Sequence, residues 1–587
     1  MCGIVGCFAQ KGCYEKLYSA LTRLEYRGYD SAGIATLSEG GAFSVRKKRG
    51  GVAAIAGAPL IGCAGIGHTR WATHGVPSDV NAHPHLCGKF ALVHNGVVEN
   101  DAALRAELSA QGERFLSQTD SELIVHLIAR AYAGDFFAAV SAACARIEGS
   151  YAVAVLCADH PDTIVCARRG CPLVAGAGGG ALYVCSDIPA LCGSAAYICP
   201  AEEGEFVVIR AGEIGFFRAD GTPVPGKVFA RVRGAARPRA VVAKTRMEAE
   251  IAEVPAALAG TLASLQEADL SACRAPFRAA RRVLSVGCGT AYHATLAFCG
   301  LLASQGVPAL CRPASEAADL AAGEGELLVA VSQSGETADT LAAARAARAR
   351  GAFLLAVTNV EQSSLAALAD AALFLRAGPE VAVAATKSYN CQLLCLYFVA
   401  ARLLASRGAP QVWEQSLAAL PALARRAFGS FSAVEQLAAA WQGARGMYFL
   451  GRGQDAVTAR EGALKVKEIA YIFAEGLPAG ELKHGPLALV EKGFPVALVC
   501  TARALVRKCA AAAAEVAARG GQVALFSQYA EALAIPAAFH IRLPAAPEPL
   551  MPALAAIPLQ HLACRLALLR GHDPDRPRNL AKSVTVE

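Results

Sequence analysis

The feature that most constrains the fold is a pattern that occurs twice in the second half of the chain. A short β-type run at 283–286 is followed by Gly-Cys-Gly-Thr and a helical run, and a similar order returns at 447–450 with Gly-Arg-Gly. A strand, a tight glycine turn and a helix in this order build a doubly wound parallel sheet. The two Gly-x-Gly pairs begin at 287 and 451, far enough apart for a whole domain each. We therefore expect two related α/β domains.

Further β-type runs alternate with helical segments after each pattern, at 326–331, 353–357, 372–375, 496–500, 523–526 and 539–543. A dinucleotide-binding fold is the obvious rival interpretation. However, the third glycine of G-x-G-x-x-G is replaced by Tyr292 in the first turn and by Ala456 in the second. The match to that fingerprint is therefore weak.

A stronger signal is the loop at 331–337, Val-Ser-Gln-Ser-Gly-Glu-Thr, which stands between a predicted strand and a predicted helix. Unsatisfied N–H groups at a helix start and Ser/Thr hydroxyls converge on an anion in such a loop. A plain helix N-cap would use only one of the three hydroxyls. The loop therefore predicts a phosphate site.

The first 220 residues have a different pattern. β-type runs broken by Gly and Pro occur at 150–158, 163–168, 181–186 and 205–210, which predicts layered sheets with few helices. Thr119 and Asp120 precede a helical run at 123–133, as an N-cap does. Asn95-Gly96 ends a short apolar run, and taken alone this dipeptide indicates a β-hairpin turn.

A thiol stands directly behind the initiator Met. If Met1 is removed, Cys2 carries a free α-amine beside its own sulfur, and an α-amine with a pKa near ~8 can act as a base at neutral pH. Nucleophile and base then belong to one residue. The plainer interpretation is an ordinary Cys in a frayed terminus or a first strand.

Length and composition limit the class of protein. A chain of 587 residues is too long to fold around a single hydrophobic core. A composition of 54% hydrophobic and 18% charged residues excludes general disorder. The net charge of +7 is small, and the basic run at 46–49 is too short for a nucleic-acid or membrane patch. The apolar run at 393–401 is shorter than the ~20 residues that cross a bilayer, so it predicts a buried helix. Twenty-one scattered cysteines with no C-x-x-C pair and no signal peptide indicate reduced thiols in the cytoplasm.

The first 220 residues contain five stretches that together resemble the glutaminase domain of the N-terminal-nucleophile amidotransferases. They are Met-Cys-Gly-Ile-Val-Gly at 1–6, Tyr-Arg-Gly-Tyr-Asp-Ser at 26–31, His-Thr-Arg-Trp-Ala-Thr-His-Gly at 68–75, Asn-Ala-His-Pro-His at 81–85 and His-Asn-Gly at 94–96. The resemblance implies an αββα sandwich in which the Cys2 thiolate attacks the side-chain amide of L-glutamine. Asn95 and Gly96 then hold the tetrahedral oxyanion.

The same resemblance assigns the residues around the nucleophile. Arg70 and Asp120 grip the carboxylate and the α-amine of glutamine, with Thr73 and His74 nearby. Trp71 gates the passage of ammonia, which would lose its nucleophilicity as ammonium in water.

Four histidines in these stretches are candidate metal ligands: His68, His83, His85 and His94. The resemblance makes them packing and hydrogen-bonding residues, and neither a carboxylate nor a Cys completes a site. We therefore expect no metal and no cofactor.

The second half resembles the sugar-isomerase (SIS) domain, which binds phosphosugars. The most specific pieces are the loop at 332–337, Glu-Gly-Ala-Leu-Lys-Val-Lys-Glu at 461–468, Gly-Glu-Leu-Lys-His-Gly-Pro at 480–486 and the terminal stretch 577–587. With the glutaminase, these pieces make nearly the whole chain similar to the family of isomerising glutamine:fructose-6-phosphate aminotransferases. The resemblance implies L-glutamine and fructose 6-phosphate as substrates and a homodimer.

By this resemblance, the sugar phosphate is held by Cys288, Thr290, Ser332, Gln333, Ser334, Thr337 and Val383. His484 helps to open the sugar ring, Lys582 forms an imine at C2, and Glu468 moves the proton between C1 and C2, with Lys465 beside it. Independently of the family, Glu461, Lys465 and Glu468 are spaced i, i+4 and i+7, which places them on one helix face. A salt-bridged surface stripe is the plainer interpretation of that spacing.

The expected architecture is multidomain α+β and α/β. It has a glutaminase domain at 2–220, a connection at 221–246, SIS domains at 247–420 and 421–570, and a C-terminal catalytic tail at 571–587. Ala291 and Ala385 depart from the family pattern, because a hydroxyl is usual at both positions, and each loses one possible hydrogen bond to the sugar.

Two rival functions are weighed. An amidotransferase with a phosphoribosyl acceptor would carry an acidic ribose-binding run, which the sequence lacks. A phosphosugar-binding regulator with a silent glutaminase would lack catalytic residues, whereas all five of the main candidates are present: Cys2, Asn95, Glu468, His484 and Lys582.

Overall fold

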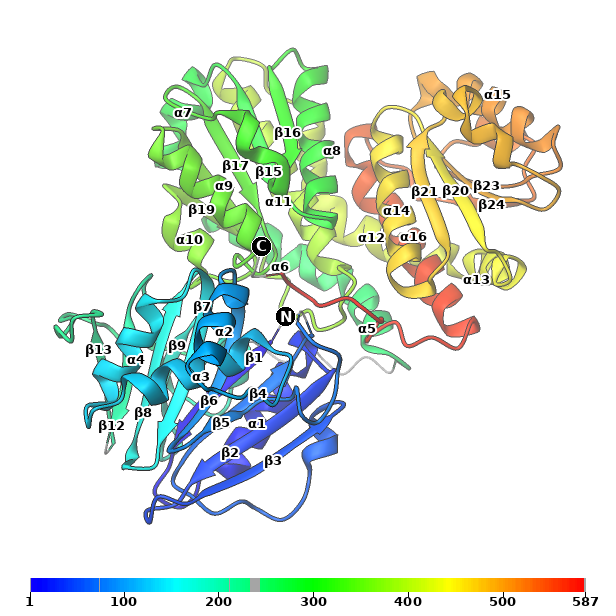
Figure 1. Cartoon of the computed structure of the whole chain (residues 1–587). Coiled ribbons are helices and arrows are strands. Elements are labelled where there is room, and N and C mark those ends of the chain that lie inside the picture. Colours follow the sequence, from blue (N-terminus) through cyan, green and yellow to red (C-terminus); the bar gives the residue numbers. More distant parts are fainter. Residues whose placement is uncertain (1, 73, 211, 233–242, 585–587) are drawn as a thin grey trace. The chain divides into compact units, whose positions relative to one another are not determined.

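The computed structural model describes residues 2–72, 74–210, 212–232 and 243–584. The chain forms two compact units (Figure 1). The first unit is Met1–Ala235 with Ala581–Glu587, and the second is Ala236–Leu580. Thr73, which we predicted to lie at the glutamine site, falls outside the described residues.

Two antiparallel sheets form the inner layers of the first unit. In spatial order, the larger sheet consists of β14 (Ala230–Arg231), β11 (Tyr197–Pro200), β9 (Val174–Gly178), β10 (Ala181–Cys185), β1 (Gly3–Phe8), β4 (Ala64–Arg70), β2 (Ser31–Leu37) and β3 (Phe43–Arg49). The smaller sheet consists of β13 (Glu213–Phe217), β12 (Phe206–Arg210), β8 (His160–Arg169), β7 (Gly149–Cys157), β6 (Phe90–Val98) and β5 (His85–Cys87).

Helices cover the outer faces of both sheets. Helix α1 (Tyr14–Leu24) packs on the larger sheet, and α3 (Asp120–Ala131) and α4 (Phe136–Ala145) pack on the smaller one, with α2 (Asp101–Ala110) against α3. Side chains alternate along β1, since Ile4 packs between the sheets while Val5 and Cys7 pack under α1. The predicted αββα sandwich is confirmed.

The hairpin interpretation of Asn95-Gly96 is wrong. Strand β6 continues through both residues to Val98, and Gly96 is paired with Tyr151 of β7. Gly96 has φ +139°, and a Cβ there would lie 2.0 Å from the Ser150 carbonyl oxygen. The glycine therefore permits a close strand pairing rather than a turn.

Helix α3 begins three residues earlier than the sequence suggested, at Asp120. Thr119 occupies the N-cap position, but its hydroxyl makes no capping hydrogen bond and lies 2.9 Å from His85 Nε2. The negative charges of Asp120 and Glu122 in the first turn favour this helix start.

The second unit contains two five-stranded parallel sheets with the same strand order. The first consists of β16 (Ala309–Pro313), β15 (Val283–Gly287), β17 (Leu327–Val331), β18 (Phe353–Thr358) and β19 (Ala371–Phe374). The second consists of β21 (Phe473–Pro478), β20 (Gly446–Gly451), β22 (Pro495–Cys500), β23 (Gln522–Ser527) and β24 (Phe539–Arg542). Both predicted doubly wound domains are confirmed, whereas the edge strands β16 and β21 were not predicted, because polar, Gly and Pro residues weaken their β signal.

Each parallel sheet is covered on both faces (Figure 1). In the first domain, α8 (Thr290–Ser304) and α11 (Lys387–Ser406) cover one face and α9 (Ala338–Ala349) the other. In the second, α14 (Gln454–Ala470), α16 (Met551–Leu569) and α13 (Phe431–Trp441) cover one face and α15 (Val506–Ala517) the other. The remaining helices are α5 (Arg246–Ala252), α6 (Val254–Glu267), α7 (Arg274–Ala279), α10 (Ser364–Leu368) and α12 (Leu420–Ala427). One continuous hydrophobic core runs through α8, α11, α14 and α16, so the two domains share it.

One helical stretch among the described residues, Glu548–Leu569, is long and apolar enough to cross a membrane. However, 83% of its apolar window is buried inside the protein, where α16 packs against α13 and α14. The predicted buried helix at 393–401 is part of α11, and all its residues there except the partly buried Phe398 are buried. Both are typical core helices.

The connection and the tail each contribute a structured contact within one unit. Ala230–Arg231, inside the predicted connection, pairs with β11 as an edge strand. Further on, Asp575 accepts hydrogen bonds from the N–H groups of Arg246 and Met247, both at 2.8 Å, while the Thr245 side chain caps the same helix. The start of α5 is therefore satisfied by the segment that follows α16.

Loss of a buried cation in the first unit should destabilise it. Arg27 is 1% exposed, and its guanidinium binds Asp187 Oδ2 through Nε at 2.9 Å and Nη2 at 2.8 Å. Because Arg27→Met leaves that carboxylate without its cation, we expect a loss of about 3 kcal/mol in the free energy of unfolding. Urea denaturation of the full chain measures it. The control is Lys48→Met, whose pair with Asp79 is exposed and should contribute under about 1 kcal/mol; equal losses in the two variants would contradict the prediction.

Candidate functional site

The Cys2 thiol lies where the start of β1 meets the end of β4. Trp71 N–H donates to Cys2 Sγ at 3.3 Å, and the sulfur is 3.5 Å from the Trp71 carbonyl oxygen. The antiparallel register pairs Gly3 with Thr69, which brings residue 71 beside residue 2. Burial raises the pKa of the Cys2 thiol, while the Trp71 N–H and the charge of Arg70 oppose that rise. Both groups stabilise a thiolate over a thiol.

Arg70 ends β4 and is almost fully buried. Its Nη2 donates to the carbonyl oxygens of His74 and, at 3.1 Å, Gly75, so the loop after β4 folds back over the guanidinium. Its Nη1 is buried without a hydrogen-bond partner among the described residues. Since a buried unsatisfied donor is costly, this atom is a candidate contact for a ligand carboxylate.

Asp120 is the buried first residue of α3. Its Oδ2 accepts the N–H of Val98 at 3.0 Å and lies 4.0 Å from His74 Nδ1. His74 therefore connects the Arg70 loop to Asp120. Three of the four residues predicted to bind glutamine are brought together in this way.

Asn95 adjoins the nucleophile. Its Nδ2 donates to the Cys2 carbonyl oxygen at 3.0 Å, and its Oδ1 is buried without a partner in the described part of the chain. Strand β6 carries Asn95 and Gly96 toward the start of β1, which it contacts across the two sheets. The amide donor predicted for the oxyanion is thus within reach of the residue it would serve.

The four predicted packing histidines are buried close to one another. The rings of His68 and His83 stack at 4.0 Å between centroids, and His83 meets His85 edge-on at 4.6 Å. Burial lowers the pKa of all four, that of His85 to about 3, so the imidazoles are neutral at pH 7. They do not form one of the clusters of candidate metal ligands found among the described residues.

The predicted phosphate loop follows β17, at the carboxyl end of the first parallel sheet. Ser332 Oγ lies 2.8 Å from Thr337 Oγ1 and accepts Gly335 N–H at 3.1 Å, while Ser334 Oγ accepts Glu336 N–H at 3.1 Å. Helix α9 begins directly after the loop, at Ala338. The carboxyl ends of parallel strands beside such a helix start are where ligands bind in doubly wound sheets.

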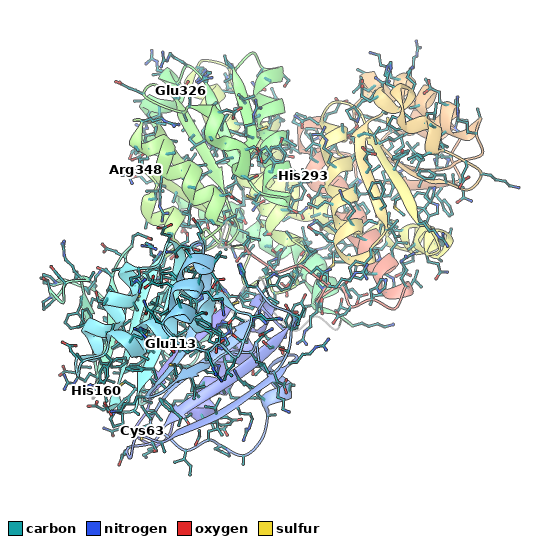
Figure 2. The ribbon with its side chains drawn as sticks, in the orientation of Figure 1. Cys63, Glu113, His160, His293, Glu326 and Arg348 are labelled. Atoms are coloured by element: carbon teal, nitrogen blue, oxygen red, sulfur yellow. The ribbon has the colours of Figure 1, made fainter. Side chains whose placement is uncertain are left out.

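The Lys465 ammonium is fully buried between α8 and α14, and the surface-stripe interpretation is wrong. Its Nζ donates to Thr290 Oγ1 at 2.9 Å and Glu468 Oε2 at 2.7 Å and lies 3.5 Å from Glu461 Oε1. Glu461 in turn accepts from Thr290 at 3.0 Å and lies 2.7 Å from His293 Nδ1 (Figure 2). Burial penalises the Glu461 carboxylate, but Lys465 and His293 reverse that effect, so the pKa of Glu461 is lowered.

His293 was not among the predicted site residues. It stands three residues after Thr290, so a helix from 290 presents both side chains on one face, and this spacing was the available signal. The partner of His293 is 168 positions away in the chain, which no local pattern indicates.

The remaining predicted residues are more dispersed. Cys288 Sγ lies 3.8 Å from both Asp339 and Thr340 at the start of α9, and Gln333 is held through its carbonyl by Asn359 N–H at 3.0 Å. Val383 lies between β19 and α11, in a segment fixed by the buried Glu380 carboxylate. His484 is exposed. Lys582 belongs to the first unit, so its predicted meeting with the sugar stays a prediction.

Known proteins match both units. A glutamine amidotransferase domain matches residues 68–193, and the SIS domain matches twice, at 277–402 and 442–570. Glutamine–fructose-6-phosphate aminotransferase (isomerizing) of Symbiobacterium thermophilum is 45% identical over 615 residues, and that of Pyrobaculum aerophilum 42% over 614, each covering 100% of both chains. The chain belongs to this aminotransferase family. A solved structure, the C-terminal domain of glucosamine-fructose-6-phosphate aminotransferase from Francisella tularensis, covers 57% of this chain and 99% of its own at 33% identity, with a TM-score of 0.55.

The two SIS domains of this family member are not equivalent as ligand sites. Thr501 follows β22 as Ser332 follows β17, at the same place in the strand order. The Asp455 carboxylate already accepts the Thr501 N–H at 2.7 Å and the Thr501 hydroxyl. An internal anion therefore takes the donors that a phosphate would need, whereas the hydrogen bonds of the Ser332, Ser334 and Thr337 hydroxyls in the described part of the chain run to one another and to the N–H groups of Gly335 and Glu336.

Between about pH 4 and pH 6, the Asp455 carboxyl should make the free energy of unfolding fall as the pH rises. Burial raises its pKa to about 6, against 3.8 normally, despite the hydrogen bonds from Thr501. From about pH 4 to about pH 6 the unfolded chain has lost a proton that the folded protein keeps. The stability of the wild type relative to Asp455→Asn should therefore drop by about 3 kcal/mol across that window.

Urea denaturation at several pH values tests this dependence. Asp79→Asn is the control, because the Arg49 N–H lowers the pKa of the Asp79 carboxyl, so its contribution to stability grows with pH. A wild-type advantage over Asp455→Asn that stays flat or rises between pH 4 and 6 would refute the prediction.

Proposed function

We propose that this chain transfers the amide nitrogen of L-glutamine to fructose 6-phosphate, which gives glucosamine 6-phosphate and glutamate. One observation carries the proposal. A single chain of this family combines the Cys2 thiol and an Arg70 Nη1 that has no partner among the described residues with the Ser/Thr loop at 332–337. The first suits an amino-acid amide and the second a sugar phosphate.

In the glutaminase reaction, the Cys2 thiolate attacks the side-chain amide carbon of glutamine, and the C–N bond breaks to release ammonia and leave a thioester. Water then hydrolyses the thioester, which releases glutamate and restores the thiol. Each glutamine therefore yields one ammonia. Arg70 Nη1 pairs with the α-carboxylate of the substrate and Asp120 accepts from its ammonium. Asn95 Nδ2 and the Gly96 N–H stabilise the oxyanion. The Trp71 N–H, 3.3 Å from Cys2 Sγ, favours the thiolate before attack.

In the isomerase reaction, ammonia replaces the C2 carbonyl oxygen of fructose 6-phosphate, which leaves as water, and a proton moves from C1 to C2. Ser332, Ser334, Thr337 and Thr290 hold the phosphate and sugar hydroxyls, with Cys288, Gln333 and Val383 lining the site. Glu468 carries the proton, and its hydrogen bond from Lys465 at 2.7 Å orients the carboxylate. Glu461 also holds Lys465, with Oε1 at 3.5 Å from Nζ, and its other oxygen lies 2.7 Å from His293 Nδ1.

Three further roles complete the proposal. His484 opens the sugar ring. Lys582 forms an imine with C2, which expels the carbonyl oxygen as water, and ammonia then displaces the lysine amine from C2. Trp71, whose ring meets Tyr29 edge-on at 5.9 Å, gates ammonia. We also propose a homodimer in the cytoplasm, in line with the many reduced cysteines.

The experiment that tests the function supplies the purified chain with glutamine and fructose 6-phosphate and detects glucosamine 6-phosphate by mass spectrometry. Cys2→Ala should abolish glutamine-dependent synthesis but retain synthesis from concentrated ammonia, because the thiol acts only on glutamine. Absence of product in the wild type would refute the proposal, and loss of both activities in Cys2→Ala would refute the division into two sites.

Gly96→Ala should impair the glutaminase reaction selectively. A Cβ would come within 2.0 Å of the Ser150 oxygen, which displaces the strand that carries the oxyanion donors. We expect glutamine-dependent synthesis to fall roughly 10²-fold or more, with ammonia-dependent synthesis unchanged. Gly88→Ala is the matched control, since Gly88 also has a positive φ but nothing within 4 Å of its Cβ position. Comparable losses in the two variants would contradict this role.

A further inference from the structure

A second cluster of reactive side chains lies in the first unit, apart from the residues of the glutaminase site. Cys87 ends β5, Glu113 stands between α2 and α3 (Figure 2), and His126 lies in the middle of α3. One ligand atom from each lies within 4.8 Å of the other two. His126 is 39 positions from Cys87 and 13 from Glu113, so no metal-binding motif is visible in the sequence.

The distances suit a small divalent cation. Cys87 Sγ is 3.6 Å and Glu113 Oε2 is 2.7 Å from His126 Nδ1. Tetrahedral zinc, with bonds of about 2.3 Å to sulfur and 2.0–2.1 Å to nitrogen, separates these two ligand atoms by about 3.6 Å. The separation of thiol and imidazole therefore already matches zinc, and the Glu113 oxygen, now 2.7 Å from His126 Nδ1, needs to move away from that nitrogen by about 0.7 Å.

The other ring nitrogen of His126 faces a second carboxylate. Nε2 lies 3.9 Å from Glu122 Oε1, and Glu122 is itself fixed by the N–H groups of Leu116 and Ser117 at 2.8 and 2.6 Å. Histidines that bind metals through one nitrogen regularly direct the other toward a carboxylate, which sets the tautomer and ring orientation. This arrangement leaves Nδ1 for the metal.

Glu113 already directs one carboxylate oxygen at the cluster, 2.7 Å from His126 Nδ1. Arg130 pairs with the other oxygen of Glu113, Oε1, at 3.4 Å, which leaves Oε2 directed at the cluster.

We propose that Cys87, His126 and Glu113 bind a zinc ion, with water as the fourth ligand and Glu122 as the carboxylate that orients His126. Zinc displaces the Nδ1 proton and the thiol proton, both of which pass to solvent. The ion ties the edge strand β5 and the segment around Glu113 to α3. Its role is to fix the helix that begins with Asp120, and its existence does not depend on the proposed reaction.

Cobalt titration of the metal-free full chain tests the site, because a cysteine ligand gives a thiolate-to-cobalt charge-transfer band. All proteins carry Cys2→Ala, so that the nucleophile does not contribute. We expect a band that saturates at one Co²⁺ per chain and disappears when Zn²⁺ is added. Cys87→Ser should remove the band. The matched control is Cys63→Ser, which alters another half-buried thiol of the same unit (Figure 2) and should retain the band.

A second variant separates binding from misfolding. Glu122→Gln retains all three ligands and should keep the band while weakening Zn²⁺ affinity, measured against a chromophoric chelator, about 10–100-fold. His160→Gln, a histidine that stacks on Phe136, should change neither measurement. Absence of a band in the parent protein, or a band that survives Cys87→Ser, would overturn the proposal.

Discussion

The second unit depends on one buried charge. Lys465 Nζ has left water entirely, and such a burial is tolerated only because Glu461, Glu468 and Thr290 all contact it. Thr290 belongs to the first SIS domain, whereas the two glutamates lie on the same helix of the second as Lys465, so the full set of contacts forms only when the two domains are packed together. The same requirement positions Glu468, the residue to which we assign the proton transfer. The buried ammonium and the carboxylate to which we assign the proton transfer therefore belong to one network.

In the first unit, strand register brings the polar groups around Cys2 together. The pairing of β1 with β4 puts the Trp71 N–H on the Cys2 sulfur, and the continuation of β6 through Asn95-Gly96 brings an amide to the Cys2 carbonyl. Asn95 and Gly96 lie within β6 and Cys2 directly precedes β1, whereas Trp71 is the first residue after β4. The loop after β4, by contrast, wraps Arg70 and leaves one guanidinium nitrogen for a ligand.

Much of this arrangement was predictable. The repeated strand, Gly-x-Gly and helix pattern gave both parallel sheets, because buried strands and helix starts carry strong local signals. The resemblance to known families named Cys2, Arg70, Asn95, Ser332 and Lys465, which the structure places in polar clusters. Local patterns failed where context decides: Asn95-Gly96 has the composition of a turn but lies inside a strand, because its pairing with β7 continues. The edge strands β16 and β21 were missed, since pairing with a neighbour compensates for a weak β composition.

By itself, the sequence determined the order of domains, the hydrophobic faces of their elements and the set of reactive residues, because these follow from local periodicity and motif chemistry. Only the tertiary structure decided which reactive residues meet. In the folded protein His293 contacts Glu461, 168 positions away, and the Thr501 N–H donates to Asp455. Cys87, Glu113 and His126 lie together in one cluster. The physical reason is that hydrogen bonds and ion pairs between distant residues depend on packing and register, which no single stretch of sequence contains.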